Sequence, residues 1–198
     1  ALESRVVTPQ SGFHCPGYYI VGGCRISCHK HGGHGNQTLS EGLMNSCNPF
    51  FVNIGQKLGS KNFYKYFDAF GFTSETDVDL PGEATPVKDV TYHSLENMGI
   101  SQVSSSSFGQ TFQVSAIQMI TGVSAIANGG NLMQPYIVGA MLDEDGNTVF
   151  EAEPVVVEED STNEAETSGS KGLFGMLLGA VIWGLAALMT PCVFPMIP

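Results

Sequence analysis

An acidic segment divides the chain and limits what each side of it can fold into. Between Glu151 and Glu166 the stretch EAEPVVVEEDSTNEAETSGS carries seven of the nineteen acidic residues and no Lys or Arg. Side chains of one charge repel each other and bury little apolar surface, so this composition is typical of a solvated linker. We expect a globular domain over residues 1–155, an acidic linker over 156–170 and a separate segment over 171–198.

The segment after the linker contains an uncharged run of nineteen residues, GLFGMLLGAVIWGLAALMT, residues 172–190. At about 1.5 Å per helical residue this run approaches the roughly 30 Å of a bilayer core. It predicts one transmembrane helix, with membrane lipid as its partner, and the alternative is a buried helix of a soluble core. The stretch TPCVFPMIP follows, and its prolines end the helix.

The first part of the chain shows the start and stop signals of ordinary helices. The sequence TLSE at Thr38 is a capping box that opens a short helix with Leu39, Leu43 and Met44 on its apolar side. Asn48 followed by Pro opens a second helix.

Later signals complete a mixed fold. The second helix ends at Gly59, a third is predicted over residues 60–70, and a fourth over residues 114–127. Between the third and fourth helices, the stretches TDVDLPGEATP and SQVSSSSFGQ are predicted to be long irregular connections. Two apolar runs flank DEDG at residues 143–146, which indicates an antiparallel hairpin. Helices followed by a hairpin predict an α+β domain.

The charge balance excludes one class of partner. The formal net charge is −11, with only eight Lys and Arg residues. A nucleic-acid-binding domain needs a basic surface to neutralise phosphates. We therefore expect no nucleic acid partner.

The stretch MNSCNPFF places Cys47 between Ser46 and Asn48, at the junction of the first two helices. Ser-x-Asn occurs three times, also at Ser60 and Ser161, so the spacing alone says little. The surrounding sequence is richer: GHGNQTLSEGLMNSCNPFFVNIGQKLG, then FYKYFDAFGF, DLPGEA, FGQTFQVSAIQMITGVSAIANGG and LMQPYIV. The sequences of these segments and their order, over about residues 13–155, resemble those of the transpeptidase domain of class B penicillin-binding proteins, which cross-link peptidoglycan.

This resemblance implies a partial β-lactamase/transpeptidase-like fold and roles for two residues. In the family, the serine of Ser-x-Asn relays protons between a catalytic lysine and the leaving nitrogen, and the asparagine amide orients the lysine and the substrate carbonyl. Carried over, Ser46 and Asn48 are the catalytic residues. The middle position varies in the family, so Cys47 is expected to point away from the cleft.

The remaining active-site motifs of the family have no match in position. Ser-x-x-Lys occurs as SCHK at Ser27 and as SGSK at Ser168, and neither copy has the helical setting that the nucleophile needs. Lys-Thr-Gly does not occur. We therefore expect a fragment of a peptidoglycan D,D-transpeptidase, inactive by itself, whose complete domain would bind the peptidoglycan stem peptide and β-lactams.

Residues 13–35 concentrate four of the five His and three of the five Cys. Zinc uses such ligands, whereas redox-active thiols and unpaired structural residues are the alternatives. The resembling family has a strand pair before GHG, and some members carry cysteines there. We assign no metal and no cofactor, and take Cys15 with Cys28 as the first candidate for a redox pair, because the intervening residues could fold back as a hairpin.

The last residues carry a second resemblance. GLAALMTPCVFPMIP is similar to the start of the membrane region of DsbD-type thiol:disulfide interchange proteins, whose proline-flanked cysteine carries electrons. Carried over, Cys192 is a redox cysteine with a thioredoxin-like thiol partner. The resulting expectation is a protein of the cell membrane with its globular domain outside the cytoplasm. The alternatives are a membrane thiol:disulfide interchange protein and a non-catalytic peptidoglycan-binding module.

Overall fold

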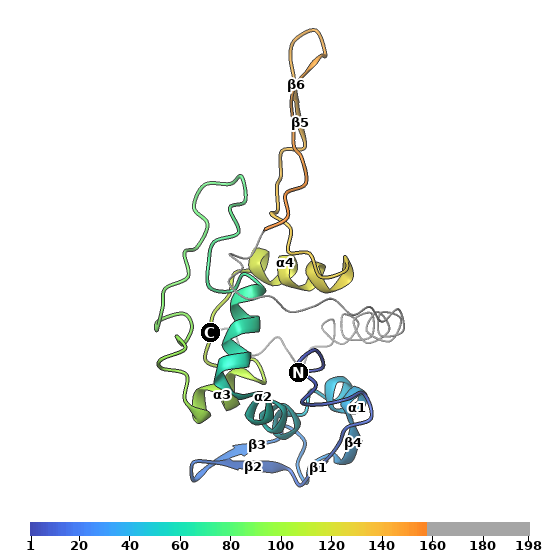
Figure 1. The fold of residues 1–198 in the computed structure, drawn as a ribbon, viewed down its shortest axis with the longest axis vertical. Coiled ribbons are helices and arrows are strands. Elements are labelled where there is room, and N and C mark those ends of the chain that lie inside the picture. Colours follow the sequence, from blue (N-terminus) through green and yellow to red (C-terminus); the bar gives the residue numbers. More distant parts are fainter. Residues whose placement is uncertain (158–198) are drawn as a thin grey trace. The chain divides into compact units, whose positions relative to one another are not determined.

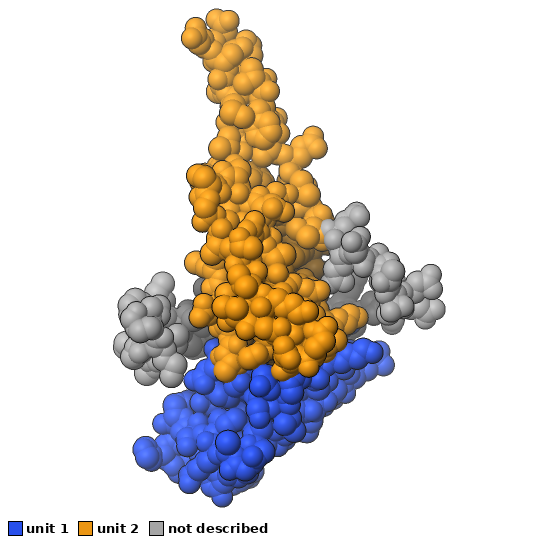
Figure 2. All heavy atoms as spheres, turned by 90° about the vertical axis from the view of Figure 1, so that its left-hand side faces the viewer, with its two compact units in different colours: residues 1–62, 98–110, 165–198 blue, residues 63–97, 111–164 orange. Residues whose placement is uncertain are grey.

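The computed structural model describes residues 1–157 and divides them into two compact units. Unit 1 comprises residues 1–62 and 98–110, and unit 2 comprises residues 63–97 and the described residues from 111 onward (Figure 2). Figure 1 labels the helices and strands. Each unit is described by itself.

Unit 1 contains two antiparallel strand pairs. Strand β1 (Gly12–Cys15) pairs with β4 (Gly35–Thr38), and β2 (Tyr18–Val21) pairs with β3 (Cys24–Ser27). Gly22 and Gly23 connect β2 to β3 with φ values of 54° and 83°. Such left-handed conformations at both turn positions suit the twist of a tight hairpin. The predicted hairpin between Cys15 and Cys28 is therefore confirmed.

The first two predicted helices of unit 1 form at their predicted starts. Helix α1 (Leu39–Met44) begins with the capping box of Thr38 and Glu41. Its predicted apolar face is confirmed for Leu39, which packs against the core, and is wrong for Leu43 and Met44, which are 48% and 66% exposed. The face turned to the core contains Gly42 instead, whose missing side chain leaves room for the ring of Phe50.

Helix α2 (Asn48–Ala69) is interrupted at Gly59, where φ is 78° and ψ is 161°. The predicted stop at this glycine is therefore confirmed, since a residue without Cβ adopts this conformation at little cost.

Helix α3 (Ile100–Ser106) lies in a stretch that was predicted to be irregular, and that prediction is wrong. Serine is a weak helix former because its hydroxyl competes for backbone groups. Here the Ser104 hydroxyl donates to the carbonyl of Ile100, and the Gln56 amide donates to the same hydroxyl over 3.2 Å. Val103 is buried at the same time. Tertiary contacts thus outweigh the local preference of the serines.

The core of unit 1 joins α2 to the strands. Phe50 and Ile54 of α2 pack with Val7, and Phe13 of β1 meets the Phe50 ring edge-on at 5.6 Å between centroids. Three buried cysteines belong to the same core: Cys15, Cys28 and Cys47. The candidate site is therefore built into the part of the unit that excludes water.

Unit 2 is organised around the ring of Phe67. Four aromatic rings lie within 5.2–6.3 Å of its centroid: Phe63, Phe72, Tyr92 and Phe112. Helix α4 (Ala116–Ala127) starts at a capping box of Ser115 and Gln118. Strands β5 (Ala140–Leu142) and β6 (Thr148–Glu151) form the predicted hairpin around residues 143–146 (Figure 1).

Helices combined with antiparallel strand pairs confirm the α+β class for the described residues. Within residues 1–157, no helix is both long and apolar enough to cross a membrane. The predicted transmembrane helix over residues 172–190 lies outside the described part of the chain.

Two neighbouring glycines allow a test of this packing. Gly32 and Gly33 have φ values of 80° and 79°, but a Cβ on Gly33 would lie 2.2 Å from the carbonyl oxygen of Cys15, whereas one on Gly32 meets nothing within 4 Å. We expect Gly32→Ala to cost about 1–2 kcal/mol for the left-handed conformation alone. Gly33→Ala should cost about 1–3 kcal/mol more through overpacking. Urea unfolding measures both, and equal losses would contradict the close approach.

Candidate functional site

The Ser-x-Asn sequence forms the turn between α1 and α2. Ser46 is exposed, whereas Cys47 is fully buried and Asn48 is half-buried. The backbone N–H of Ser46 donates to the Leu43 carbonyl, and that of Cys47 to the Gly42 carbonyl, both over 3.0 Å. These bonds place the Ser46 side chain at the surface and the Cys47 side chain in the core.

Two further features describe this turn. Ser46 has a φ of 45°, which is uncommon for a residue with a Cβ. The Asn48 amide donates to the Ser27 carbonyl over 3.3 Å.

An open depression of about 420 Å³ lies along β1, β4 and the start of α1, and neither Ser46 nor Asn48 lines it. The catalytic roles of Ser46 and Asn48 stay predictions.

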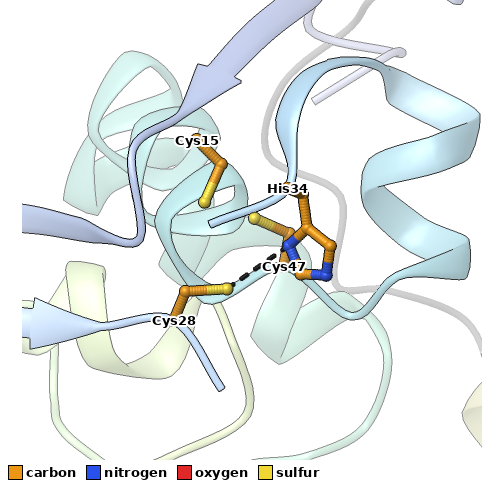
Figure 3. A group of neighbouring side chains, drawn as sticks. All are labelled: Cys15, Cys28, His34 and Cys47. Carbon is orange, nitrogen blue, oxygen red and sulfur yellow. Dashed lines mark hydrogen bonds between the residues drawn. The ribbon is translucent and has the colours of Figure 1, made fainter. Parts of the chain in front are cut away.

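Cys47 does not pack alone, because it joins Cys15, Cys28 and His34. The three Sγ atoms and a ring nitrogen of His34 all lie within 4.8 Å of one another. Figure 3 shows the four side chains pointing toward a common centre, with Cys28 Sγ 3.3 Å from His34 Nδ1. We call these four residues the Cys3His cluster.

The strand pairings explain why distant residues meet here. Cys15 is opposite Gly35 in the β1–β4 pair, which brings His34 beside the end of β1. The β2–β3 hairpin returns the chain to its starting point, and the Cys28 N–H donates to the Gly17 carbonyl over 2.8 Å. Helix α1 follows β4 directly, and the turn after α1 brings Cys47 to the same place.

The environment of the cluster affects its three thiols differently. Burial raises the pKa of the Cys47 thiol to about 12, and it also raises the pKa of Cys28. Burial acts in the same direction on Cys15, but hydrogen bonds from the backbone of His34 and Gly17 and from the other two thiols outweigh it and lower its pKa. Cys15 is therefore the most acidic of the three thiols.

His34 is held in its neutral form. Burial lowers the pKa of its imidazole, and the charges of His29 and Lys30 lower it further. A neutral imidazole nitrogen is the form that binds a metal ion.

Backbone N–H groups lower the pKa of all three thiols of the cluster. These groups belong to Gly17 and His34 for Cys15, to Lys30 for Cys28 and to Phe50 for Cys47. Such donors stabilise negative charge on sulfur and are the outer contacts that orient metal-bound ligands.

Three thiols and one imidazole also match the ligand set of a structural zinc site. With a Zn–S bond of about 2.3 Å, tetrahedral coordination separates two sulfurs by about 3.8 Å. The ligand atoms lie within 4.8 Å of one another, so small side-chain movements would close the site. We expected no metal from the sequence. His34 and Cys47 were missed as cluster members, although the density of His and Cys in residues 13–35 pointed to this region.

The predicted redox residues are placed only in part. Cys15 and Cys28 lie together in the cluster, and all four described cysteines, including the exposed Cys24, are free thiols. Cys192 lies outside the described residues. A redox role for these cysteines stays a prediction.

The two Ser-x-x-Lys copies were not expected to contain the nucleophile, which in the family lies at the start of a helix. Ser27 ends strand β3, and the following residues through Lys30 are in no helix. The copy at Ser168 lies outside the described residues. The copy at Ser27, which lies in the described part of the chain, is therefore not at the start of a helix.

Comparisons with known proteins identify relatives of the chain. It is 40% identical over 141 residues to stage V sporulation protein D of Bacillus subtilis, an alignment that covers 71% of this chain and 21% of that protein. Among solved structures, penicillin binding protein 3 of Mycobacterium tuberculosis, complexed with aztreonam, matches with a TM-score of 0.68 at 25% identity, over 78% of this chain and 34% of that one.

A further structure supports the fold. The D,D-transpeptidase domain of a peptidoglycan glycosyltransferase from Eggerthella lenta matches with a TM-score of 0.73 at 22% identity, over 96% of this chain and 48% of that one. The transpeptidase-like α+β fold expected from the sequence is thereby confirmed. The profile of the penicillin binding protein transpeptidase domain matches residues 1–170, and the chain belongs to this family.

Proposed function

We propose that this chain supplies the Ser-x-Asn part of a peptidoglycan D,D-transpeptidase that acts in cell-wall cross-linking. The observation that carries the proposal is the turn itself: exposed Ser46 and half-buried Asn48 flank a cysteine that is anchored in the core. The chain spans 21% of its sporulation relative, so the activity of a whole enzyme is part of this proposal.

The chemistry assigned to the two residues follows from their functional groups. The Ser46 hydroxyl both donates and accepts a hydrogen bond, so it can pass a proton between a catalytic lysine and the leaving nitrogen. The Asn48 amide offers two donors and an acceptor, which suits it to orient that lysine and the carbonyl of a stem peptide or β-lactam. The nucleophilic serine and its lysine would come from the Ser-x-x-Lys motif of a complete domain.

A chimera tests this assignment. We would replace the matching segment of the B. subtilis relative with residues 1–157 of this chain and measure labelling by a fluorescent penicillin. The chimera should be labelled, and Ser46→Ala should slow labelling by about 10²–10⁴-fold, the range for loss of a proton-transfer group. The second described copy of the pattern offers a matched control, Ser60→Ala, which should label normally.

The chain by itself provides the negative reference. It should form no labelled band, because we expect it to lack the family's serine nucleophile with its activating lysine. A band that disappears in Ser46→Ala of the isolated chain would make Ser46 the nucleophile. A folded chimera that labels equally with and without Ser46 would overturn the proposed relay.

We further propose that the Cys3His cluster binds one Zn²⁺ ion. Its four ligand atoms favour a metal over a simple disulfide, because a disulfide uses two sulfurs and leaves the third sulfur and His34 without a function. Bound zinc would replace the thiol protons of the cysteines, so its affinity should rise with pH. The ion would tie three segments of unit 1 together and hold the turn that carries Ser46.

Cobalt titration tests the metal site. Adding Co²⁺ to the reduced chain should produce the thiolate charge-transfer band and the visible bands of tetrahedral cobalt, saturating at one equivalent. Cys47→Ser should abolish or strongly weaken them, whereas the control Cys24→Ser, at an exposed cysteine, should not. Absence of the bands in the wild-type chain, or their full retention in Cys47→Ser, would refute the site.

The segment over residues 171–198 carries a third proposal. We propose that residues 172–190, which carry no charge, hold the chain in the cell membrane, with the globular domain outside the cytoplasm. Cys192 would then exchange electrons with a thioredoxin-like partner. This thiol exchange would reach Cys15 and Cys28 only when they hold no metal, because metal-bound thiolates are occupied.

Membrane extraction separates this proposal from its alternative. The full chain should stay in the membrane fraction after alkaline carbonate treatment, and a variant lacking residues 172–190 should be released. Release of the full chain would instead favour burial of the segment in a soluble core.

A further inference from the structure

The open depression along β1, β4 and the start of α1 has no part in the functions proposed above (Figure 1). Its volume of about 420 Å³ lies in the range of small-molecule sites, about 300–1,000 Å³. Neither Ser46 nor Asn48 lines it, and no member of the Cys3His cluster does. A ligand site here would therefore be separate from both the Ser-x-Asn turn and the metal site.

The register of β1 and β4 explains which side chains line the depression. Successive side chains of a strand point to opposite faces, so Gly12 and His14 share one face of β1. Directly opposite them in β4 are Thr38 and Asn36, and all four residues are exposed. Because Gly12 carries no side chain, the surface beside Thr38 is left open.

Three side chains that line the depression keep one hydrogen-bonding atom unused. His14 Nδ1 lies 2.8 Å from Asn36 Oδ1, and an amide oxygen only accepts, so Nδ1 is the donor and Nε2 of the neutral ring is an acceptor. Asn36 Nδ2 remains as a donor. Glu41 Oε1 remains as an acceptor, because Thr38 bonds to Oε2. Within residues 1–157, none of these three atoms has a hydrogen-bond partner.

Two acceptors and one donor call for a ligand with two donors and one acceptor. A simple cation would match Glu41 but would leave the Asn36 donor without a partner, and an anion would be repelled by Glu41. A neutral sugar with an acetamido group offers hydroxyl donors to His14 and Glu41 and a carbonyl acceptor to Asn36. Because the depression is open, neighbouring sugars of a chain can continue beyond it.

We propose that this depression binds one sugar of an N-acetylated saccharide, with Asn36 donating to the acetamido carbonyl and His14 and Glu41 accepting from hydroxyls. The strands of peptidoglycan consist of such sugars, so the site would contact the strand itself and not its peptides. The inference goes beyond the proposed transpeptidase role and does not rest on it.

Titration of the full chain with N,N′,N″-triacetylchitotriose tests the site by NMR. The backbone amide resonances of His14, Asn36 and Glu41 should shift together and saturate with one dissociation constant. Cellotriose, which has hydroxyls in place of the acetamido groups, should bind about 5-fold more weakly, the effect of one hydrogen bond. Tighter binding of the unacetylated, cationic trimer would reveal simple attraction to Glu41 and would overturn the proposal, as would the absence of saturable shifts.

A glycine variant with a matched control tests the location. Gly12 is outside the left-handed region, and a Cβ there would lie 3.7 Å from the Gln37 carbonyl oxygen, an ordinary contact. Gly12→Val should therefore fold and fill the depression, which abolishes the saturable shifts. Gly139→Val is the control, because Gly139 is also outside the left-handed region, meets nothing within 4 Å and lies in unit 2. Unchanged binding by folded Gly12→Val would place the saccharide elsewhere and refute the site.

A second variant tests the recognition of the acetamido group. Asn36→Asp keeps an acceptor for His14 Nδ1 and removes the donor, so the preference for the acetylated trimer over cellotriose should disappear. A preference that persists in this variant would overturn the role of Asn36. If Gly12→Val does not fold, this comparison decides. Penicillin labelling of the chimera is measured separately, so a chain that binds no saccharide leaves the proton relay of Ser46 untouched.

Discussion

The antiparallel pairing of β1 with β4 is the constraint on which the rest of unit 1 depends. It places Cys15 opposite Gly35, so that His34 reaches the end of β1, and it holds the buried side chain of Gln37 in the same strand. Side chains alternate along a strand, so residues 35 and 37 share one side of β4. Because α1 begins directly after β4, the pairing also determines where Cys47 enters the core.

The middle residue of the Ser-x-Asn motif, Cys47, is buried in the core and anchors the turn. No role in the transpeptidase reaction is assigned to it. Burial of the Cys47 side chain, together with the hydrogen bonds from the backbone of Ser46 and Cys47 to α1, determines the turn. The uncommon φ of Ser46 is kept because both neighbours are held. An exposed functional residue on a buried anchor is more precisely oriented than the same residue in a free loop.

Local signals predicted local structure well. The capping box of Thr38 and Glu41, the stop at Gly59 and the turn around residues 143–146 are short patterns in which a side chain or a glycine acts on its own backbone. The predictions failed where distant contacts decide. The serine-rich α3 forms because Gln56 and the core hold it, and α1 turns Gly42 inward because Phe50 occupies that space.

The sequence by itself determined the class of the fold, the starts of α1 and α2, the hairpin around residues 143–146, and the resemblance that identified Ser46 and Asn48, because these depend on short stretches of chain. Only the tertiary structure decided that Cys15, Cys28, His34 and Cys47 meet. Their spacings match no single motif, since two separate strand pairings and a helix bring them together. Such contacts follow from the register of strands and the direction of a buried side chain, neither of which a local pattern encodes.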